Sequence, residues 1–238
     1  MKEPIETLLF DFGGTLDAKG VAWKERFYAH YRAEGLDMTA DAFESCFFAA
    51  DDALVGNLAP ATDLAGTAGA LATNLETELA HRGASHGRSD SDRGARVASR
   101  FMSEASATFA RNRPVLRELR KRYRLGVVSN FYGNLEAVCQ GAGLAPLFAV
   151  LVDSHCAGVK KPDPAIFRAA LAPLEAIPET TVFVGDSLRR DGAGARQAGM
   201  RFIWMAPEGV AAAEALAAAD PPLEHAVTEL GDLMKILP

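Results

Sequence analysis

Residues 181–200 of the chain read TVFVGDSLRRDGAGARQAGM. The first five residues form a short, largely apolar run that stops at Asp186. Unbroken runs of this kind are typical of strands buried on both faces of a parallel sheet. Residues 191–198 have the composition of a helix and stop at Gly199. A buried strand followed directly by a helix is the repeating unit of α/β folds.

Short apolar runs occur at four other places along the chain. Three of them are followed by a polar residue: Thr7–Phe10 by Asp11, Leu125–Val128 by Ser129, and Phe148–Val152 by Asp153. The fourth, Arg201–Met205, is not. Helical segments at 134–141 and 164–174 lie between these runs, so we predict an α/β fold whose core is a Rossmann-like parallel sheet with helices on both faces. Ligands of such sheets bind beyond the carboxyl ends of the strands. We therefore expect Asp11, Ser129 and Asp186 to lie close together.

The stretch from residue 19 to residue 111 does not follow this rhythm. It contains aromatic residues at helical spacing, such as Trp23, Phe27 and Tyr31, and no convincing strand. We interpret 19–111 as an α-helical cap domain inserted into a core domain made of residues 1–18 and 112–238. The aromatic spacing indicates core packing, residues 81–96 are expected to form a loop between two cap helices, and residues 210–219 a surface helix.

Composition limits the classes of protein that fit. The 238 residues are 49% hydrophobic and 24% charged, which is typical of a globular chain with one substantial core and a smaller companion domain. A net charge of −6 argues against a nucleic-acid surface, and the basic cluster at residues 117–124 is interpreted as a solvated helix end. The three cysteines are widely spaced, which predicts neither a disulfide framework nor a zinc site. Without a membrane-length apolar stretch or a secretory signal, we expect a cytoplasmic monomer or homodimer.

Four separated segments carry a family resemblance. They are residues 10–16 (FDFGGTL), 128–130 (VSN), 158–167 (GVKKPDPAIF) and 184–200 (VGDSLRRDGAGARQAGM). In type and in order they resemble the four motifs of the haloacid dehalogenase superfamily of hydrolases. The last segment is the most specific, whereas VSN by itself is a weak signal. The resemblance does not extend to the cap.

The resemblance implies three catalytic residues. Asp11 would be the nucleophile that forms an aspartyl intermediate, a route open to carboxylates. Ser129 would hydrogen-bond a phosphoryl oxygen. Lys161 would hold the nucleophile in place and neutralise the charge of the transferring group.

The resemblance also implies a metal site and a substrate site. Two acids at a strand end and at the following helix start suit a hard cation such as Mg²⁺. Asp11, Asp186 and the Gly13 carbonyl are the implied ligands, with Asp191 as a further ligand or as support. The substrate would be a small phosphorylated molecule, and the residues expected to bind it are Gly13, Gly14, Ser129, Asn130 and Lys161.

Position 13 departs from the family pattern. The family's phosphatases have a second Asp there, which acts as a general acid and base, and this chain has Gly13. Loss of such a group costs roughly 10²–10⁴-fold in rate. A phosphatase without it would need an acidic leaving group, such as an acyl or enol phosphate, or an acid from elsewhere. Asp17, His30 and His155 are candidates by sequence proximity, although we expect Asp17 to cap the first cap helix and both histidines to have surface or packing roles.

Two other functions remain open at this point. A 2-haloacid dehalogenase-like or phosphonatase-like hydrolase also lacks the second Asp. The acidic pair Asp186 and Asp191 argues against the first, since halide displacement needs no metal, and the lack of any lysine between Lys24 and Lys121 argues against the second. The remaining alternative is a catalytically impaired phosphate-binding protein. The presence of Asp11, Lys161 and Asp186 favours the Mg²⁺-dependent phosphatase.

Overall fold

The computed structural model describes residues 4–83, 92–210 and 225–238. Within them, six strands form one parallel sheet in the order β3-β2-β1-β4-β5-β6. The strands are β1 Thr7–Phe10, β2 Arg124–Ser129, β3 Val150–Asp153, β4 Thr181–Gly185, β5 Arg201–Met205 and β6 His225–Val227. The predicted α/β fold with a Rossmann-like parallel sheet is confirmed.

The position of β1 in the sheet decides where the polar strand ends meet. Phe10 at its end is in register with Val127 of β2 on one side and with Val184 of β4 on the other. The next residue, Asp11, donates its backbone N–H to the Val184 carbonyl at 2.9 Å. The segments that follow β1, β2 and β4 therefore leave the sheet side by side at the same edge.

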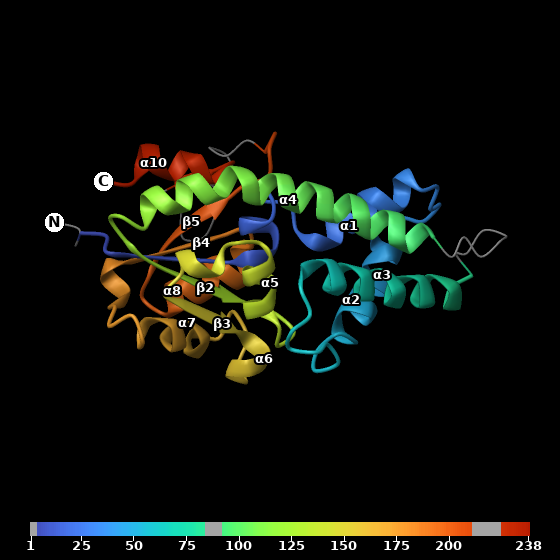
Figure 1. Ribbon diagram of the computed structural model, residues 1–238, viewed down its shortest axis with the longest axis horizontal. Helices are drawn as coiled ribbons and strands as arrows, with labels where there is room; N and C mark the ends of the chain where they lie inside the picture. The colour runs from blue at the N-terminus through green and yellow to red at the C-terminus, as the bar shows by residue number, and fades with distance from the viewer. Residues whose placement is uncertain (1–3, 84–91, 211–224) are drawn as a thin grey trace.

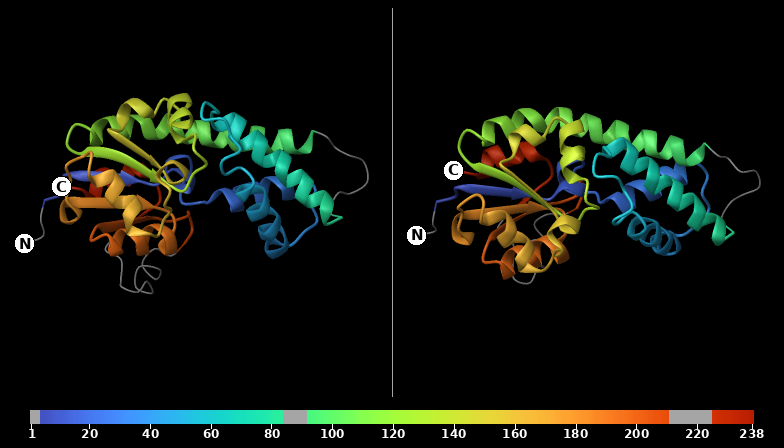
Figure 2. Two further views of the ribbon diagram at one scale, coloured as in Figure 1. Left: turned by 90° about the horizontal axis from the view of Figure 1, so that it is seen from below. Right: turned by 60° about the horizontal axis from the view of Figure 1, so that its bottom comes forward.

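Both faces of the sheet are buried. Leu8 and Phe10 belong to one hydrophobic cluster, and Leu9, which points the other way, belongs to a second with Phe167 and Phe183. The short helices of this part of the chain flank the sheet (Figure 2) and are α5 Leu135–Gly141, α6 Ser154–Ala157, α7 Pro164–Leu171, α8 Ala193–Gln197 and α10 Leu233–Ile236. Helices on both faces explain why the strands read as unbroken apolar runs.

Four longer helices form the rest of the structure: α1 Trp23–Ala33, α2 Ala40–Asp52, α3 Leu64–His81 and α4 Arg93–Leu119. Figure 1 shows α1, α2 and α3 gathered beyond one edge of the sheet, while α4 runs from this group back alongside the sheet. The expected boundary between residues 111 and 112 falls inside α4, which continues through it. Residues 84–91 of the expected loop and 211–219 of the expected surface helix lie outside the described residues.

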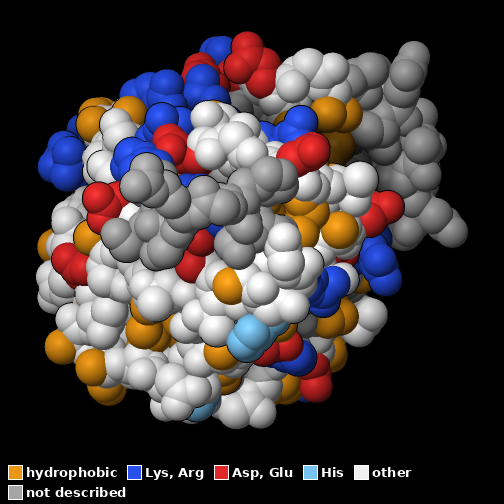
Figure 3. All heavy atoms as spheres, turned by 90° about the vertical axis from the view of Figure 1, so that its right-hand side faces the viewer, with side chains coloured by type: hydrophobic (Ala, Val, Ile, Leu, Met, Phe, Trp, Pro, Cys, Tyr) orange, Lys and Arg blue, Asp and Glu red, His pale blue; other side chains and the backbone are white. Residues whose placement is uncertain are grey.

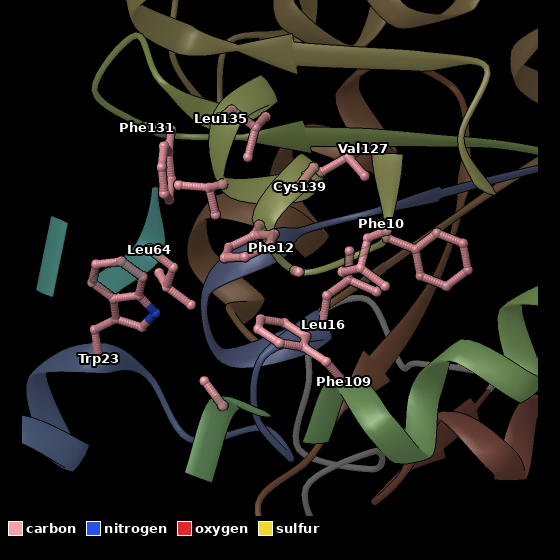
Figure 4. Packing of buried hydrophobic residues seen from close by; sticks show 14 of the residues in the cluster. Phe10, Phe12, Leu16, Trp23, Leu64, Phe109, Val127, Phe131, Leu135 and Cys139 are labelled. Atoms are coloured by element: carbon pink, nitrogen blue, oxygen red, sulfur yellow. The ribbon is translucent and has the colours of Figure 1, made fainter. Parts of the chain in front are cut away.

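Aromatic side chains join the helical group to the sheet edge. The ring of Phe131 lies 5.9 Å from that of Trp23 and 5.6 Å from that of Phe12, both nearly perpendicular, and Phe12 also contacts Phe109 of α4 (Figure 4). Each such pair contributes about 0.5–1.5 kcal/mol beyond the area it buries. Trp23, Phe27 and Tyr31 are all buried, so their predicted role in core packing is confirmed.

On the face formed by the helical group, positive and negative side chains are intermixed and hydrophobic ones are scattered (Figure 3). None of the helices among the described residues is both long enough and apolar enough to span a membrane.

Candidate active site

Three carboxylates meet at the carboxyl edge of the sheet. Asp11 follows β1, Asp186 follows β4, and Asp191 lies in the turn η4 (Leu188–Gly192) just before α8. One oxygen from each lies within 4.8 Å of the others. Asp11 and Asp191 are buried, so the cluster of negative charge is largely removed from water. Such an arrangement needs compensating positive charge.

Lys161 supplies part of that charge. Its Nζ lies 2.7 Å from Asp11 Oδ1 and 2.8 Å from Asp191 Oδ1, and its side chain is only 2% exposed. Burial by itself would lower the pKa of Lys161, but the charges of Asp11 and Asp191 outweigh it, and the net shift is upward. The ammonium is therefore held in its charged form against the nucleophile candidate.

Asn130 fixes the position of Lys161. Its side-chain amide donates to the Lys161 carbonyl at 3.1 Å, and its carbonyl oxygen accepts from the Lys161 N–H at 2.7 Å. Asn130 also lines the cavity, and its contact with substrate stays a prediction. Ser129 lies closer to the chemistry, donating its hydroxyl to Asp11 Oδ1 at 2.9 Å.

Asp186 has an unmet requirement. Its Oδ1 is buried and has no hydrogen-bond partner. Burial, followed by the charges of Asp191 and Asp11, holds the pKa of Asp186 well above its usual range. An unpartnered buried oxygen beside two further carboxylates fits a divalent cation, which would satisfy the oxygen and offset the repulsion.

Two glycines make room for this cluster. A Cβ at Gly14 would lie 2.4 Å from Asp186 Oδ2, and the positive φ of 87° at Gly14 also favours glycine. A Cβ at Gly185 would lie 2.4 Å from Asp191 Oδ2. The glycines of the sequence motifs are thus explained by close approach of carboxylates.

Hydrogen bonds among Asp17, Trp23 and Arg26, here called the Asp17 cluster, fix the turn that follows Asp11. Asp17 Oδ1 accepts from the Gly14 N–H at 2.7 Å. Its Oδ2 accepts from Trp23 Nε1 at 2.7 Å and from Arg26 Nη1 at 2.8 Å. The Gly14 N–H is therefore already committed to Asp17, and Gly14 is not among the residues that line the cavity, which differs from its expected role in substrate binding.

The prediction that Asp17 caps the first cap helix is wrong. Helix α1 begins at Trp23, and its N-cap residue is Ala22, which has no side-chain acceptor. Asp17 is instead fully buried, and it accepts hydrogen bonds from the side chains of Trp23 and Arg26 in the first turn of α1. His30 pairs with Glu104 at 3.3 Å, and His155 is exposed beside Gly133, so neither lines the cavity described next.

The cluster opens into a cavity of about 920 Å³. The cavity is lined by the candidate site residues Asp11, Gly13, Ser129, Lys161 and Asp186 and by residues of α1 and α2. Sequence reasoning missed several of the other lining residues, which are Trp23, Lys24, Phe47, Phe48, Asp51, Tyr132, Arg189 and Arg190. Arg189 and Arg190 lie within the fourth sequence motif, and the aromatic spacing that includes Trp23 indicated core packing and not a cavity wall.

Comparisons with known proteins agree with this geometry. A family model described as haloacid dehalogenase-like hydrolase matches residues 5–199. A bovine (Bos taurus) haloacid dehalogenase-like hydrolase domain-containing protein 3 is 44% identical over 95 residues, 39% of this chain and 38% of the relative. A phosphoserine phosphatase from Thermus thermophilus is 45% identical over 65 residues, 27% of this chain and 26% of the relative. The chain thus matches well under half the length of these curated relatives.

A solved structure extends the similarity to the whole fold. The 2-haloacid dehalogenase from Pseudomonas syringae has a TM-score of 0.53 and 26% identity, with 97% of each chain covered. The family model covers most of this chain and includes all four sequence motifs. The chain therefore belongs to the haloacid dehalogenase-like hydrolases.

Proposed function

We propose that the protein is a Mg²⁺-dependent phosphatase acting on a small phosphorylated molecule. The observation that carries the proposal is the group of three carboxylates, Asp11, Asp186 and Asp191, with Lys161 bridging two of them and a buried Asp186 oxygen lacking a partner. A dehalogenase that displaces halide with one carboxylate has no use for the other two acids. The phosphoserine phosphatase among the relatives supports the same choice.

The Mg²⁺ ion would be held by Asp11, Asp186 and the Gly13 carbonyl, with Asp191 as a further ligand or as the group that orients Lys161. When bound, the ion neutralises charge on the phosphoryl oxygens. Lys161 adds a second positive charge from the other side of Asp11. The residues of the cluster therefore match the dianionic character of a phosphate ester.

The two oxygens of Asp11 have different surroundings. Oδ1 accepts from Ser129 Oγ at 2.9 Å and lies 2.7 Å from Lys161 Nζ. Among the residues with described positions, no donor is directed at Oδ2. We assign the attack on phosphorus to Oδ2: the new Oδ2–P bond forms as the bond to the leaving oxygen breaks. Water then hydrolyses the aspartyl phosphate and regenerates Asp11.

The surroundings of Gly13 bear on the leaving group. A Cβ at Gly13 would lie 3.2 Å from Trp23 Nε1, so the indole edge covers the place where the phosphatases of the family have their acid. Trp23 Nε1–H is already donated to Asp17. A leaving group that meets this wall receives no proton from residue 13, which favours substrates with acidic leaving groups such as acyl phosphates.

We also propose that residues 19–111 act as a cap domain over a core of residues 1–18 and 112–238. Trp23, Phe47 and Phe48 line the same cavity as Asp11, where they would shield the reaction from bulk water. The choice of substrate would depend on these residues.

The test is phosphate release with and without Mg²⁺ from acetyl phosphate, p-nitrophenyl phosphate and a simple alkyl phosphate. We expect Mg²⁺-dependent turnover of acetyl phosphate and p-nitrophenyl phosphate and at least about 10²-fold slower turnover of the alkyl phosphate. Asp11→Asn abolishes turnover, whereas Asp37→Asn, at an 86% exposed side chain, leaves it unchanged. Absence of phosphate release from all three substrates would refute the proposal. Release of halide from a haloacid would then favour a dehalogenase.

A further inference from the structure

Two arginine side chains line the cavity without a hydrogen bond or an ion pair to any described residue. Arg189 and Arg190 are exposed and lie in η4, between the metal-site candidates Asp186 and Asp191. Both line the cavity that contains Asp11. Across residues 4–83, 92–210 and 225–238, neither guanidinium makes a hydrogen bond or an ion pair. Arginine side chains in binding cavities commonly hold carboxylates or phosphates through paired hydrogen bonds.

The backbone that carries them is firmly held. The Arg190 N–H donates to Ser187 Oγ at 3.2 Å, the Asp191 N–H donates to the Ser187 carbonyl at 2.8 Å, and the Ser187 N–H donates to Asp191 Oδ2 at 3.0 Å. The two guanidinium groups are therefore presented from a turn whose position is fixed by the same residues that form the carboxylate cluster. Such a fixed base reduces the entropy lost when the side chains bind a ligand.

The other cations of the cavity are already paired. Lys161 contacts Asp11 and Asp191. Lys24 lies 2.6 Å from Glu44 and 3.4 Å from Glu25. Arg189 and Arg190 are thus the uncommitted positive charges among the described residues that line the cavity.

Arg190 and Asp51 line the same cavity. Burial raises the pKa of Asp51, and the positive charge of Arg190 opposes that shift. Asp51 is at the end of α2, and its Oδ1 accepts a hydrogen bond from Tyr132. Arg190 therefore shares one cavity with Asp11, Asp186 and Asp51, where a ligand that fills the cavity would meet it.

We propose that Arg189 and Arg190 form a subsite for a second negatively charged group of the substrate, a carboxylate or a second phosphate, separate from the phosphoryl group at Asp11. This proposal rests on the proposed function and narrows its substrate class to phosphorylated molecules with a second anionic end. A cavity of about 920 Å³ holds a molecule with two such ends. The aromatic side chains of the wall, among them Trp23, Phe48 and Phe131, would contact the carbon atoms between them.

The experiment is isothermal titration calorimetry of the full chain in Mg²⁺ with two non-hydrolysable ligands. Carboxyethylphosphonate has a carboxylate at its far end, and propylphosphonate has the same number of carbon atoms without it. We expect the first to bind roughly 10- to 100-fold more tightly, as a charge-assisted hydrogen-bonded pair provides. A propane diphosphonate with phosphonates at both ends distinguishes a site for carboxylate from one for phosphate.

Variants test whether the difference in affinity between the two phosphonates depends on Arg189 and Arg190. Arg189→Gln with Arg190→Gln brings the ratio of the two affinities close to one and leaves the affinity for propylphosphonate nearly unchanged. Arg117→Gln, the same chemical change at an exposed position near the end of α4, keeps the full ratio. Both positions of the double variant are exposed, so folding is not expected to suffer.

The outcomes separate the subsite from the phosphatase. Equal binding of both ligands to the natural protein overturns the subsite even where phosphate esters are hydrolysed. Equal weakening of both ligands in the double variant also overturns it, because the arginines would then act as a general attraction for any dianion. Arginine-dependent binding without phosphate release supports the subsite and refutes the phosphatase, and binding of neither phosphonate overturns the subsite while phosphate release still decides the phosphatase.

Discussion

Replacing Asp17 by alanine tests the Asp17 cluster, the buried connection between the turn after Asp11 and helix α1. The change removes the acceptor of three hydrogen bonds, from the Gly14 N–H, Trp23 Nε1 and Arg26 Nη1. It also leaves the Arg26 guanidinium, 6% exposed, without its closest carboxylate. Breaking a buried ion pair by removing one partner typically costs about 3–5 kcal/mol.

The remaining contacts of Arg26 place the expected cost at the lower end of that range. Arg26 keeps Glu104 at 3.3 Å and the Phe101 carbonyl at 3.2 Å, and its guanidinium lies 4.0 Å from the centre of the Phe101 ring. We therefore expect Asp17→Ala to lower the free energy of unfolding by about 3 kcal/mol, which for a chain of this size lowers the melting temperature by about 6–12 °C.

Urea unfolding followed by circular dichroism measures this change. The control is Asp37→Ala, because Asp37 also faces an arginine, at 3.6 Å, but is 86% exposed, and its loss should cost no more than about 1 kcal/mol. A loss below about 1 kcal/mol for Asp17→Ala would refute the reasoning, since a buried Arg26 would then have to be tolerated without its partner.

Two further predictions concern the glycines and the thiols. Gly14→Ala should weaken Mg²⁺ binding in calorimetry and lower phosphate release by roughly 10²-fold, because its Cβ would displace Asp186; Gly35→Ala, with a similar φ of 85° and open space around it, should leave both unchanged, and normal Mg²⁺ affinity in Gly14→Ala would contradict the account. Ellman's reagent should react rapidly only with Cys156 in the folded protein and with all three thiols after unfolding, because Cys46 and Cys139 are buried and burial raises the pKa of Cys139 to about 12. Rapid reaction of a second thiol in the folded state would show that one of these two positions is open to solvent.

Much of the sheet could be predicted because its strands are buried on both faces. The apolar runs of β1, β4 and β5 begin and end at the predicted residues. The edge strand β6 has only His225, Ala226 and Val227, too few residues to form a recognisable apolar run, and it was missed. Asp11, Ser129 and Asp186 followed from the same logic, since polar residues after buried parallel strands share one edge. Lys161 and Asp191 were implied by the family resemblance.

The features that were missed depend on where distant side chains return. Asp17 was interpreted by a local rule for helix caps, but its donors come from Trp23 and Arg26 after the chain has turned into α1. Asn130 follows Ser129 in sequence, and its pairing with the backbone of Lys161, 31 residues later, was not predicted. Neither pairing has a signal in local spacing, because each requires the position of a second element.

The most direct test of the central claim is to look for a phosphoryl group on Asp11. The protein is mixed with Mg²⁺ and an excess of acetyl phosphate, quenched in acid, digested, and examined by mass spectrometry. The account predicts a phosphorylated peptide that contains Asp11, present with Mg²⁺ and absent in its absence. Phosphate release without any such peptide at every quench time, together with unchanged phosphate release in Asp11→Asn, would contradict Asp11 as the nucleophile.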